Sequence, residues 1–416
     1  GAVISPALID GHIHVESTLL TPYELARTIS GRGTGTIIAD PHEIGNVLGE
    51  VGVEWMLQAS EGAPADLLYM APSCVPASPL ETSGAQIDAD GVARLLEHDR
   101  VLGLAEVMNY PGVVAGDPGL VAKIAATGKA PVDGHAPGLS GKQLSAYVAA
   151  GPRSEHEATT ATEAREKLQQ GLWLMLREGT PARNLSDLLE VIDVNTATRC
   201  LFSADDLSPL DLLERGHIDN HLRICVAAGI DPLIALQIAT ANAAARFALL
   251  DRGVVAPGRL DDLVVFEDLK QFKAERVLHR GVVVAKDGES LVPPRPVDAP
   301  QNTVNIPEQK LNFTVPAESG KVRVVGVVPG QIVTESLEAE LDLVDGAVQP
   351  DPQRDVVKLA VVERHTGKST VATAFVKGLG LRSGAIASSV AHDHHNLIVA
   401  GTTNQDMQAA VSALAA

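Results

Sequence analysis

The stretch Leu8-Ile9-Asp10-Gly11-His12-Ile13-His14-Val15-Glu16 follows an apolar run and places two histidines two residues apart. Residues i and i+2 of a β-strand project from the same face, so His12 and His14 can both reach one ion from the end of a buried strand. Neutral imidazoles are common ligands of divalent first-row metals. A His-x-His pair also occurs in loops without any function, and the surrounding chain has to decide between the two interpretations.

Short β-rich runs alternate with helical stretches, such as 23–32 and 185–194, from residue 1 to about 250. This alternation predicts βα units around a parallel sheet, and eight such runs predict an α/β fold of the TIM-like (β/α)8 type. No GxGxxG follows the first run, which argues against a doubly wound open sheet. The predicted strands are 3–9, 36–39, 67–71, 102–107, 131–134, 153–156, 172–177 and 198–203.

Ionisable side chains gather where the predicted strands end. In a TIM barrel the active site lies at these carboxyl ends, in the loops that follow the strands. One polar residue at a strand end carries little information, but several from different strands would converge on one face. These residues are His12 and His14 after the first predicted strand, Asp40, His42 and Glu43 after the second, Glu106 at the end of the fourth, His135 after the fifth, His156 in the sixth, and Asp205 and Asp206 after the eighth.

The composition is typical of a soluble globular protein, with 45% hydrophobic and 20% charged residues, and no apolar run is long enough to span a bilayer. We therefore expect neither a signal nor a membrane anchor. The formal net charge of −19 and the lack of clustered Lys and Arg argue against nucleic-acid binding. Cys74, Cys200 and Cys225 form no CxxC pair, which indicates buried thiols in a reducing cytoplasm.

Three regions follow one another along the chain. We predict a barrel over 1–250, a small β-sandwich module with a Pro-rich linker over 251–300, and a C-terminal α+β domain over 301–416. Residues 231–247 have an Asp N-cap, a Pro in the first turn and helical spacing, and we expect this helix to pack outside the barrel. The partner strands of the β module are expected upstream of residue 1, so we interpret the chain as a fragment of something longer.

The third region contains the segment His392-Asp393-His394-His395-Asn396 between apolar, strand-like stretches. Four metal-capable side chains in a row indicate a second metal site or an active-site lid. A solvated turn is the plain alternative.

With these residues assembled, the chain resembles the bacterial and archaeal adenine deaminase family of the amidohydrolase superfamily. His-x-His alone would indicate only the superfamily, whereas the PHE, ETSGA and EVMNYPG segments are more specific. The chain departs from the family pattern at Phe202-Ser203-Ala204-Asp205-Asp206, where relatives commonly have a Cys-Thr-Asp-Asp-like segment, and at His394, which replaces a serine. The matching segments are 9–17, 39–44, 81–85, 106–112, 133–139 and 217–219, and the 392–396 segment matches at His392, Asp393, His395 and Asn396.

The resemblance implies a dinuclear metal site. It assigns His12 and His14 to one divalent ion, His135 and His156 to a second, and Glu106 to the bridging position that a carbamylated Lys fills in many relatives. Asp205 matches a ligand that also moves protons. A hydroxide bridging the two ions would convert adenine to hypoxanthine and ammonia in purine salvage, and the resemblance favours manganese or iron over zinc.

Substrate contacts are expected from the loops after the second and third strands. His42, Glu43 and Glu81 are candidates for reading a base edge, and Asp206 and His217 are candidates for the same task. A supporting role behind the ligands explains each of them equally well, and His217 could also cap a helix. His392, Asp393 and His395 are candidates for an additional site.

Two alternatives stay open beside adenine deamination. The same metal frame supports hydrolysis of other cyclic amides or amidines, or of an acetylated amino sugar. A truncated relative could also bind metal without activity. A nucleic-acid deaminase would ordinarily show the combined H-x-E and P-C-x-x-C signature, and no P-C-x-x-C occurs in this sequence. The expected partners are adenine and water. Without its upstream strands, the β module would have an unpaired sheet edge, and this edge and the large size of the chain favour a homodimer.

Overall fold

The computed structural model describes residues 2–306 and 310–415. The chain divides into two compact units. The first unit comprises Gly1–Gly45, Gly49–Ser78 and Gln86–Asp298, and the second comprises Asn46–Leu48, Pro79–Ala85 and Ala299–Ala416. The main boundary, after Asp298, falls inside the predicted Pro-rich linker. Among the described residues, no helix has the length and apolar character needed to cross a membrane.

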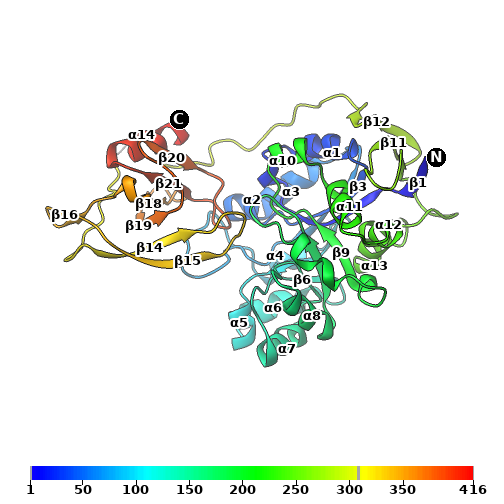
Figure 1. Ribbon diagram of the computed structural model, residues 1–416, viewed down its shortest axis with the longest axis horizontal. Coiled ribbons are helices and arrows are strands. Elements are labelled where there is room, and N and C mark those ends of the chain that lie inside the picture. The colour runs from blue at the N-terminus through cyan, green and yellow to red at the C-terminus, as the bar shows by residue number, and fades with distance from the viewer. Residues whose placement is uncertain (1, 307–309, 416) are drawn as a thin grey trace. The chain divides into compact units, whose positions relative to one another are not determined.

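The first unit contains parallel strands that close into a barrel, and Figure 1 labels β3, β6 and β9 among them. Strands β2 to β6 pair in chain order, and β7 to β9 form a second run. Backbone hydrogen bonds close the ring, from Asp205 N to His12 O at 2.9 Å and from Arg153 N to Val132 O at 3.0 Å. The predicted TIM-like fold is therefore confirmed. The strands are β2 (Leu8–Ile13), β3 (Thr34–Ala39), β4 (Asp66–Ala71), β5 (Val101–Val107), β6 (Val132–Gly134), β7 (Ser154–Glu155), β8 (Trp173–Arg177) and β9 (Cys200–Ser203).

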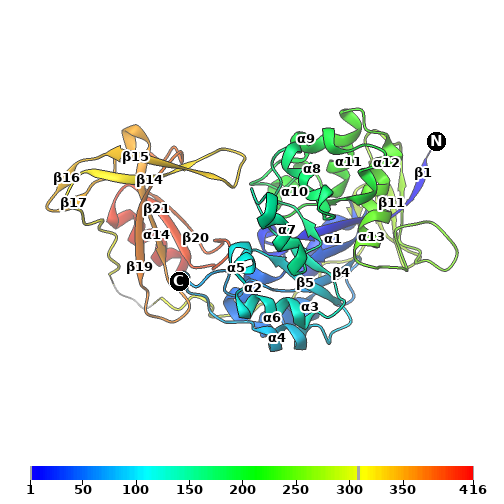
Figure 2. The same cartoon turned by 90° about the horizontal axis from the view of Figure 1, so that it is seen from below.

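Helices between the strands cover the outside of the barrel, and Figure 2 shows α4 and α6 side by side. Most of them begin with a residue whose side chain or ring favours a helix start, as with Asp117 before Pro118. The helices are α1 (Pro22–Ser30), α2 (His42–Leu48), α3 (Glu50–Ala59), α4 (Ala89–Leu95), α5 (Tyr110–Ala115), α6 (Pro118–Ala126), α7 (Gly141–Ala150), α8 (Ala161–Gln169), α9 (Leu185–Leu188), α10 (Pro209–Glu214) and α11 (Ile218–Ala227).

The predicted first strand, 3–9, is divided in the structure. β1 (Val3–Pro6) pairs antiparallel with β10 (Leu263–Phe266), and the barrel strand β2 begins only at Leu8. β10 continues into β11 (Ala274–His279), β12 (Val282–Lys286) and β13 (Glu289–Ser290). The β module thus takes one partner strand from this chain, and the prediction that its partners lie upstream of residue 1 was wrong for that strand.

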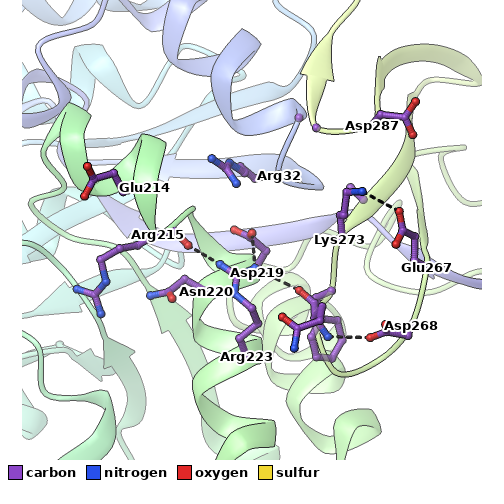
Figure 3. A pocket seen from close by; sticks show the side chains of 15 residues that line it. Arg32, Glu214, Arg215, Asp219, Asn220, Arg223, Glu267, Asp268, Lys273 and Asp287 are labelled. Carbon is purple, nitrogen blue, oxygen red and sulfur yellow. Dashed lines mark hydrogen bonds and ion pairs between the residues drawn. The ribbon is translucent and has the colours of Figure 1, made fainter.

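A hollow of about 610 Å³ lies between α11, the end of α1 and the β module (Figure 3). Two pairs of its charged side chains contact one another: Arg223 Nη1 lies 2.7 Å from Asp219 Oδ2, and Lys273 Nζ lies 2.9 Å from Glu267 Oε1. None of the predicted metal ligands lines this hollow. We therefore treat it as separate from the strand-end site.

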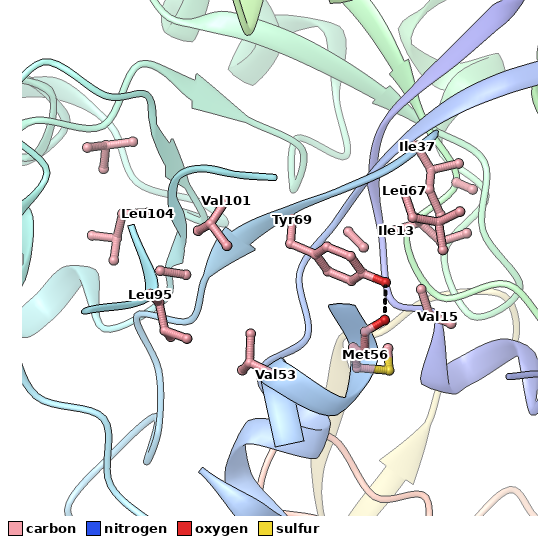
Figure 4. Packing of buried hydrophobic residues seen from close by; sticks show 14 of the residues in the cluster. Ile13, Val15, Ile37, Val53, Met56, Leu67, Tyr69, Leu95, Val101 and Leu104 are labelled. Carbon is pink, nitrogen blue, oxygen red and sulfur yellow. Dashed lines mark hydrogen bonds between the residues drawn. The ribbon is translucent and has the colours of Figure 1, made fainter. Parts of the chain in front are cut away.

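Apolar residues on the outer side of the strands pack beneath the helices (Figure 4). Ile37, Leu67 and Tyr69 belong to this layer, and the Tyr69 hydroxyl donates to Met56 O in α3 at 2.9 Å. Burying one such side chain contributes roughly 1.5–3 kcal/mol. The alternation of outward and inward residues along each strand thereby fixes which side chains enter the barrel.

The helix predicted over 231–247 forms α12 (Pro232–Gln237), a π-helical turn (Ile238–Asn242) and α13 (Ala243–Arg246). Its last part does not lie outside the barrel, so that prediction was wrong there. α13 packs against strand residues that alternate with those of the outer layer, and Arg246 Nη2 donates to Val132 O at 3.0 Å. The small alanines allow this helix to close the amino-terminal end of the barrel interior. The packed strand residues are Ile9, Ile38, Leu68, Met70, Ala105, Met175 and Leu201.

The second unit contains a six-stranded sheet with the order β15-β14-β19-β18-β21-β20. α14 (Asn404–Ala415) packs on one face of this sheet through Met407 and Val411. This combination agrees with the predicted α+β domain. The strands are β14 (Lys321–Val327), β15 (Thr334–Glu340), β18 (Val356–Val362), β19 (Val371–Lys377), β20 (Ala385–Ser388) and β21 (Leu397–Gly401), with a separate pair β16 (Leu343–Val344) and β17 (Ala347–Val348).

Candidate active site

The two histidines of the opening stretch lie together at the carboxyl end of β2. His12 and His14 are almost completely buried, and their Nε2 atoms are 3.2 Å apart. At this distance the two rings can share one N–H···N hydrogen bond, or both nitrogens can bind one cation. His14 Nδ1 lies 3.1 Å from the backbone oxygen of Asp40, a contact that fixes the ring when Nδ1 carries the proton.

Glu106, at the end of β5, faces two pairs of histidines with its two carboxylate oxygens. Oε1 lies 3.7 Å from His12 Nε2 and 3.3 Å from His14 Nε2. Oε2 lies 2.5 Å from His135 Nδ1 and 3.3 Å from His156 Nε2. One buried carboxylate therefore stands between the two histidine pairs.

Asp205 follows β9 and has a left-handed backbone conformation, with φ of 56°. Aspartate tolerates this region better than most residues, and the Asp205 N–H is tied to His12 O at 2.9 Å. Its Oδ1 atom lies 3.2 Å from His14 Nε2 and 3.7 Å from His12 Nε2. The strand-end residues His12, His14, Glu106, His135, His156 and Asp205 are thus brought together in one cluster.

The electrostatics of this cluster favour carboxylate anions beside cationic partners. Burial lowers the pKa of His14, but its contacts with Asp205 and Glu106 outweigh burial and raise the pKa well above the ordinary value. Burial raises the pKa of Glu106, but His135 and His156 outweigh it and hold the pKa well below the ordinary value. Asp205 behaves like Glu106, because His12 and His14 outweigh burial. In this low-dielectric site, positive charge has to be present next to both carboxylates.

The residues present fit two divalent cations. Ligand atoms of His12, His156 and Asp205 lie within 4.8 Å of one another, and the same is true of Glu106, His135 and His156. Imidazole nitrogen combined with carboxylate oxygen suits manganese, iron or zinc. His156 belongs to both groups, and Glu106 reaches the first histidine pair through Oε1, which lies 3.3 Å from His14 Nε2.

A second layer of polar residues borders this cluster. His42 Nδ1 lies 2.9 Å from Asp40 Oδ2 and 3.6 Å from Glu106 Oε1. The Ser17 hydroxyl donates to Asp206 Oδ1 at 2.5 Å and approaches Glu43 Oε1 at 3.4 Å. The structure therefore brings His42, Glu43 and Asp206 near the predicted ligands.

Glu16 lies in the same layer and has an altered acidity. Burial and the neighbouring Glu43 carboxylate raise its pKa to about 7. Ile44 N donates to Glu16 Oε1 at 3.1 Å, which holds the side chain in place. This border of the site can therefore present either a carboxylate or a carboxylic acid near neutral pH.

His217 lies behind the cluster instead of in it. Its Nε2 atom is 2.8 Å from Asp10 Oδ2, and its Nδ1 atom is 2.9 Å from Thr34 Oγ1. Asp10 Oδ1 in turn accepts from His12 N and Ala204 N, each at 3.1 Å. Asp10 thus ties β2 to the end of β9, and His217 orients Asp10 from the N-terminus of α11.

Glu81 and the 392–396 segment belong to the second unit. Within that unit, Asn396 Nδ2 donates to Thr82 O at 2.8 Å, so the segment contacts the ETSGA loop. His395 is buried and has a positive φ of 48°. The roles of Glu81, His392, Asp393 and His395 in binding stay predictions.

Sequence reasoning missed Glu157 and Arg177. Glu157 Oε1 lies 3.3 Å from His156 Nε2 and accepts from Arg177. Burial raises the pKa of Glu157, but His156, His135 and Arg177 outweigh it and bring the pKa to about 2. Both residues had a signal in the sequence, since Glu157 directly follows a predicted ligand and Arg177 ends the seventh predicted strand.

Comparisons with known proteins show which family the chain belongs to. Residues 3–289 match the model of the amidohydrolase family, and residues 331–416 match the adenine deaminase C-terminal domain. An adenine deaminase of Desulfatibacillum aliphaticivorans is 47% identical over 421 residues, which cover 100% of this chain and 74% of the relative. This chain belongs to the adenine deaminase family. Adenine deaminase 2 of Carboxydothermus hydrogenoformans is 48% identical over 419 residues, covering 100% of this chain and 73% of the relative.

Among solved structures, atrazine chlorohydrolase TrzN from Arthrobacter aurescens superposes with a TM-score of 0.50. The match has 13% sequence identity and covers 71% of this chain and 86% of that one. At this identity the likeness shows the fold alone. The barrel of this adenine deaminase family member is therefore one that other hydrolases share, and its chemistry has to be argued from the site.

Proposed function

We propose that this protein catalyses the hydrolytic deamination of adenine to hypoxanthine and ammonia. The observation that carries the proposal is the position of Glu106, whose two oxygens face the His12–His14 pair and the His135–His156 pair. The membership in the adenine deaminase family supports the choice of substrate. In the reaction, a bond forms between C6 of adenine and a water oxygen, and the bond from C6 to the exocyclic nitrogen breaks.

His12, His14, His135, His156, Glu106 and Asp205 would hold two divalent cations, which when bound lower the pKa of water so that it can attack near neutral pH. Glu106 would hold the two histidine pairs at a fixed distance from each other, because one of its oxygens contacts each pair. Asp205 faces the cluster with Oδ1 and is an anion at neutral pH, so it can accept the proton of the attacking water. It would then deliver that proton to the ring or to the departing amine.

The border residues supply hydrogen-bonding groups for a planar base. Adenine presents both ring nitrogens that accept and N–H groups that donate, so a site with several carboxylates can bind its donor edge. The Ser17 hydroxyl donates to Asp206 Oδ1 and lies 3.4 Å from Glu43 Oε1, so both carboxylates lie beside it. His42, oriented by Asp40, would complete this edge of the site. We assign these residues to substrate binding.

We further propose manganese or iron as the metal, a cytoplasmic location and a homodimer. Nitrogen and oxygen ligands suit manganese, iron or zinc, and the likeness to adenine deaminases favours the first two. Cys74, Cys200 and Cys225 are buried and form no disulfide with one another, as is usual in a reducing compartment. The assembly state can be measured by light scattering of the purified chain.

The decisive experiment follows the conversion of adenine to hypoxanthine by absorbance and the release of ammonia. The protein is stripped of metal and reconstituted with Mn(II) or Fe(II), and Glu106→Ala is measured beside it. We expect turnover that requires metal and is lost in the variant. Glu363→Gln is the matched control, since Glu363 is a buried carboxylate of the second unit that binds backbone N–H groups of its own turn.

A folded wild-type protein that binds two metal ions without turning over adenine would overturn the proposal. In that case other cyclic amides and amidines become the compounds to test. If Glu363→Gln also lost metal binding, the loss in Glu106→Ala would report a folding defect and not the removal of a metal-binding side chain.

A further inference from the structure

Arg177 is a buried cation directly behind the candidate site. It is the last residue of β8, and its side chain is 1% exposed. Nη1 lies 2.9 Å from Asp205 Oδ2 and also donates to Glu157 Oε1, while Nη2 donates to Asn184 Oδ1 at 3.1 Å. Three side chains from three different segments therefore fix one guanidinium.

The two oxygens of Asp205 have different partners. Oδ1 faces His12 and His14, at 3.7 and 3.2 Å, whereas Oδ2 faces Arg177. A carboxylate on a short side chain can rotate and exchange its oxygens unless one of them is held. The guanidinium supplies this restraint, because a charge-assisted hydrogen bond is both strong and directional.

We propose that Arg177 is a positioning residue that acts through Asp205. By holding Oδ2, it keeps Oδ1 aimed at the site formed by His12 and His14. The inference rests on the proposed function for its catalytic consequence, but the orientation of Asp205 can be tested without adenine. Arg177 touches none of the atoms assigned to substrate binding, so its loss should lower kcat more than it changes KM.

A purely structural role is the alternative explanation. Arg177 could serve only to neutralise Glu157, which is buried beside His156. The position of Asn184 argues for a more specific role, since a neutral amide oxygen adds direction but no charge balance. The two explanations differ in whether the effects of removing Arg177 and Asp205 are independent.

The test measures Mn(II) binding by electron paramagnetic resonance in wild type, Arg177→Ala, Asp205→Ala and the double variant, as full-length chains. Losing a group that orients a metal ligand typically costs 10- to 100-fold in metal affinity, and we expect Arg177→Ala to weaken binding by about that factor. If Arg177 acts through Asp205, the double variant binds Mn(II) no more weakly than Asp205→Ala alone.

Guanidinium rescue separates positioning from folding. Guanidinium ion at low millimolar concentration should restore part of the Mn(II) affinity and of kcat to Arg177→Ala, whereas urea, which has a similar shape and no charge, should not. Arg177→Lys keeps the positive charge and replaces Arg177→Ala as the test variant if the alanine variant does not fold. Arg246→Ala is the matched control, since Arg246 is a buried arginine paired with Asp133 at the other end of the barrel.

Equal or tighter Mn(II) binding by Arg177→Ala would overturn the inference. It would also be overturned if the double variant lost Mn(II) affinity by the product of the two single losses, because the two residues would then act independently. Guanidinium that restored Arg246→Ala as much as Arg177→Ala would overturn it too. If the Mn(II) results follow expectation but wild type does not deaminate adenine, the proposed function fails while the positioning role stands.

Discussion

The two carboxylate oxygens of Glu106 face different pairs of histidines, and the two oxygens of Asp205 face different kinds of partner. At the residue scale, each carboxylate therefore connects two parts of the site. His135 and His156 together outweigh the burial of Glu106, and His12 and His14 do the same for Asp205. In the metal-free protein, removing the negative charge at either position would leave buried, protonated histidines without the partner that compensates their positive charge.

Asp205→Asn tests the proton-transfer role of this residue. The amide keeps the shape of the side chain but cannot accept the proton of an attacking water. General acid–base groups contribute about 10²- to 10⁴-fold, so we expect kcat per bound metal pair to fall within that range. Steady-state adenine turnover with parallel metal analysis measures the change. A variant with two metals and a kcat within fivefold of wild type would contradict the assignment.

His221→Gln tests a pH dependence at a residue outside the ligand set. His221 is fully buried, and burial lowers its pKa below the ordinary value of 6.5. As the pH falls through 6.5, the unfolded chain binds a proton at this position before the folded chain does. Stability present above pH 6.5 is therefore lost on acidification, by up to about 1.4 kcal/mol per pH unit from this group.

The measurement is the free energy of unfolding by urea at pH 5.5 and pH 8, in chelator, for wild type and His221→Gln. The variant should lose less stability between pH 8 and pH 5.5 than wild type does. Identical pH dependence in the two proteins would show that the pKa of His221 is the same in the folded and unfolded chains.

At the element scale, α13 closes one end of the barrel while the metal ligands occupy the other. Arg246 of α13 pairs with Asp133 of β6 and donates to Val132 O. The helix also packs Ala243, Ala244 and Phe247 against inward-facing residues of the strands. This arrangement separates stability, at the amino ends of the strands, from chemistry, at their carboxyl ends.

Arg246→Met should destabilise the protein without changing the chemistry. Removing one partner of a buried ion pair leaves an uncompensated charge and typically costs about 3–5 kcal/mol. Urea unfolding followed by circular dichroism measures the loss. The double variant Arg246→Met with Asp133→Asn should regain part of it, because the orphaned charge is gone. The result would be contradicted by a loss below 1 kcal/mol in the single variant.

At the scale of the whole molecule, the six candidate ligands all belong to the first unit. Metal binding should therefore stabilise the barrel and leave the second unit unchanged. A ligand present at 100 times its dissociation constant stabilises its site by about 2.7 kcal/mol.

Removal of metal by a chelator should lower the melting temperature of the barrel transition in differential scanning calorimetry. A transition assigned to the second unit, with its own sheet and α14, should keep its temperature. A shift of both transitions on chelation would contradict this expectation. It would instead favour metal binding by His392, Asp393 or His395.

The sequence by itself determined the barrel and the residues that converge in it. Period-2 and helical patterns alternate over the first 250 residues or so, and parallel strands place their carboxyl ends at one edge, so strand-end histidines and carboxylates meet whatever the details. His12, His14, Glu106 and Asp205 could be selected for this reason. The family motifs then indicated the reaction.

Only the tertiary structure decided how those groups are oriented and supported. The apolar pattern of 3–9 does not show where one strand ends and the next begins. Pairing with β10 divides the segment into the partly exposed β1 and the buried barrel strand β2. Arg177 ends β8 and meets Glu157 and Asp205, which follow the two strands that pair with β8, and their side-chain contacts depend on how those strand ends are oriented. Which side chains on separate strands contact one another depends on how the strands pair in the closed barrel, and the spacing of residues along one strand does not specify this.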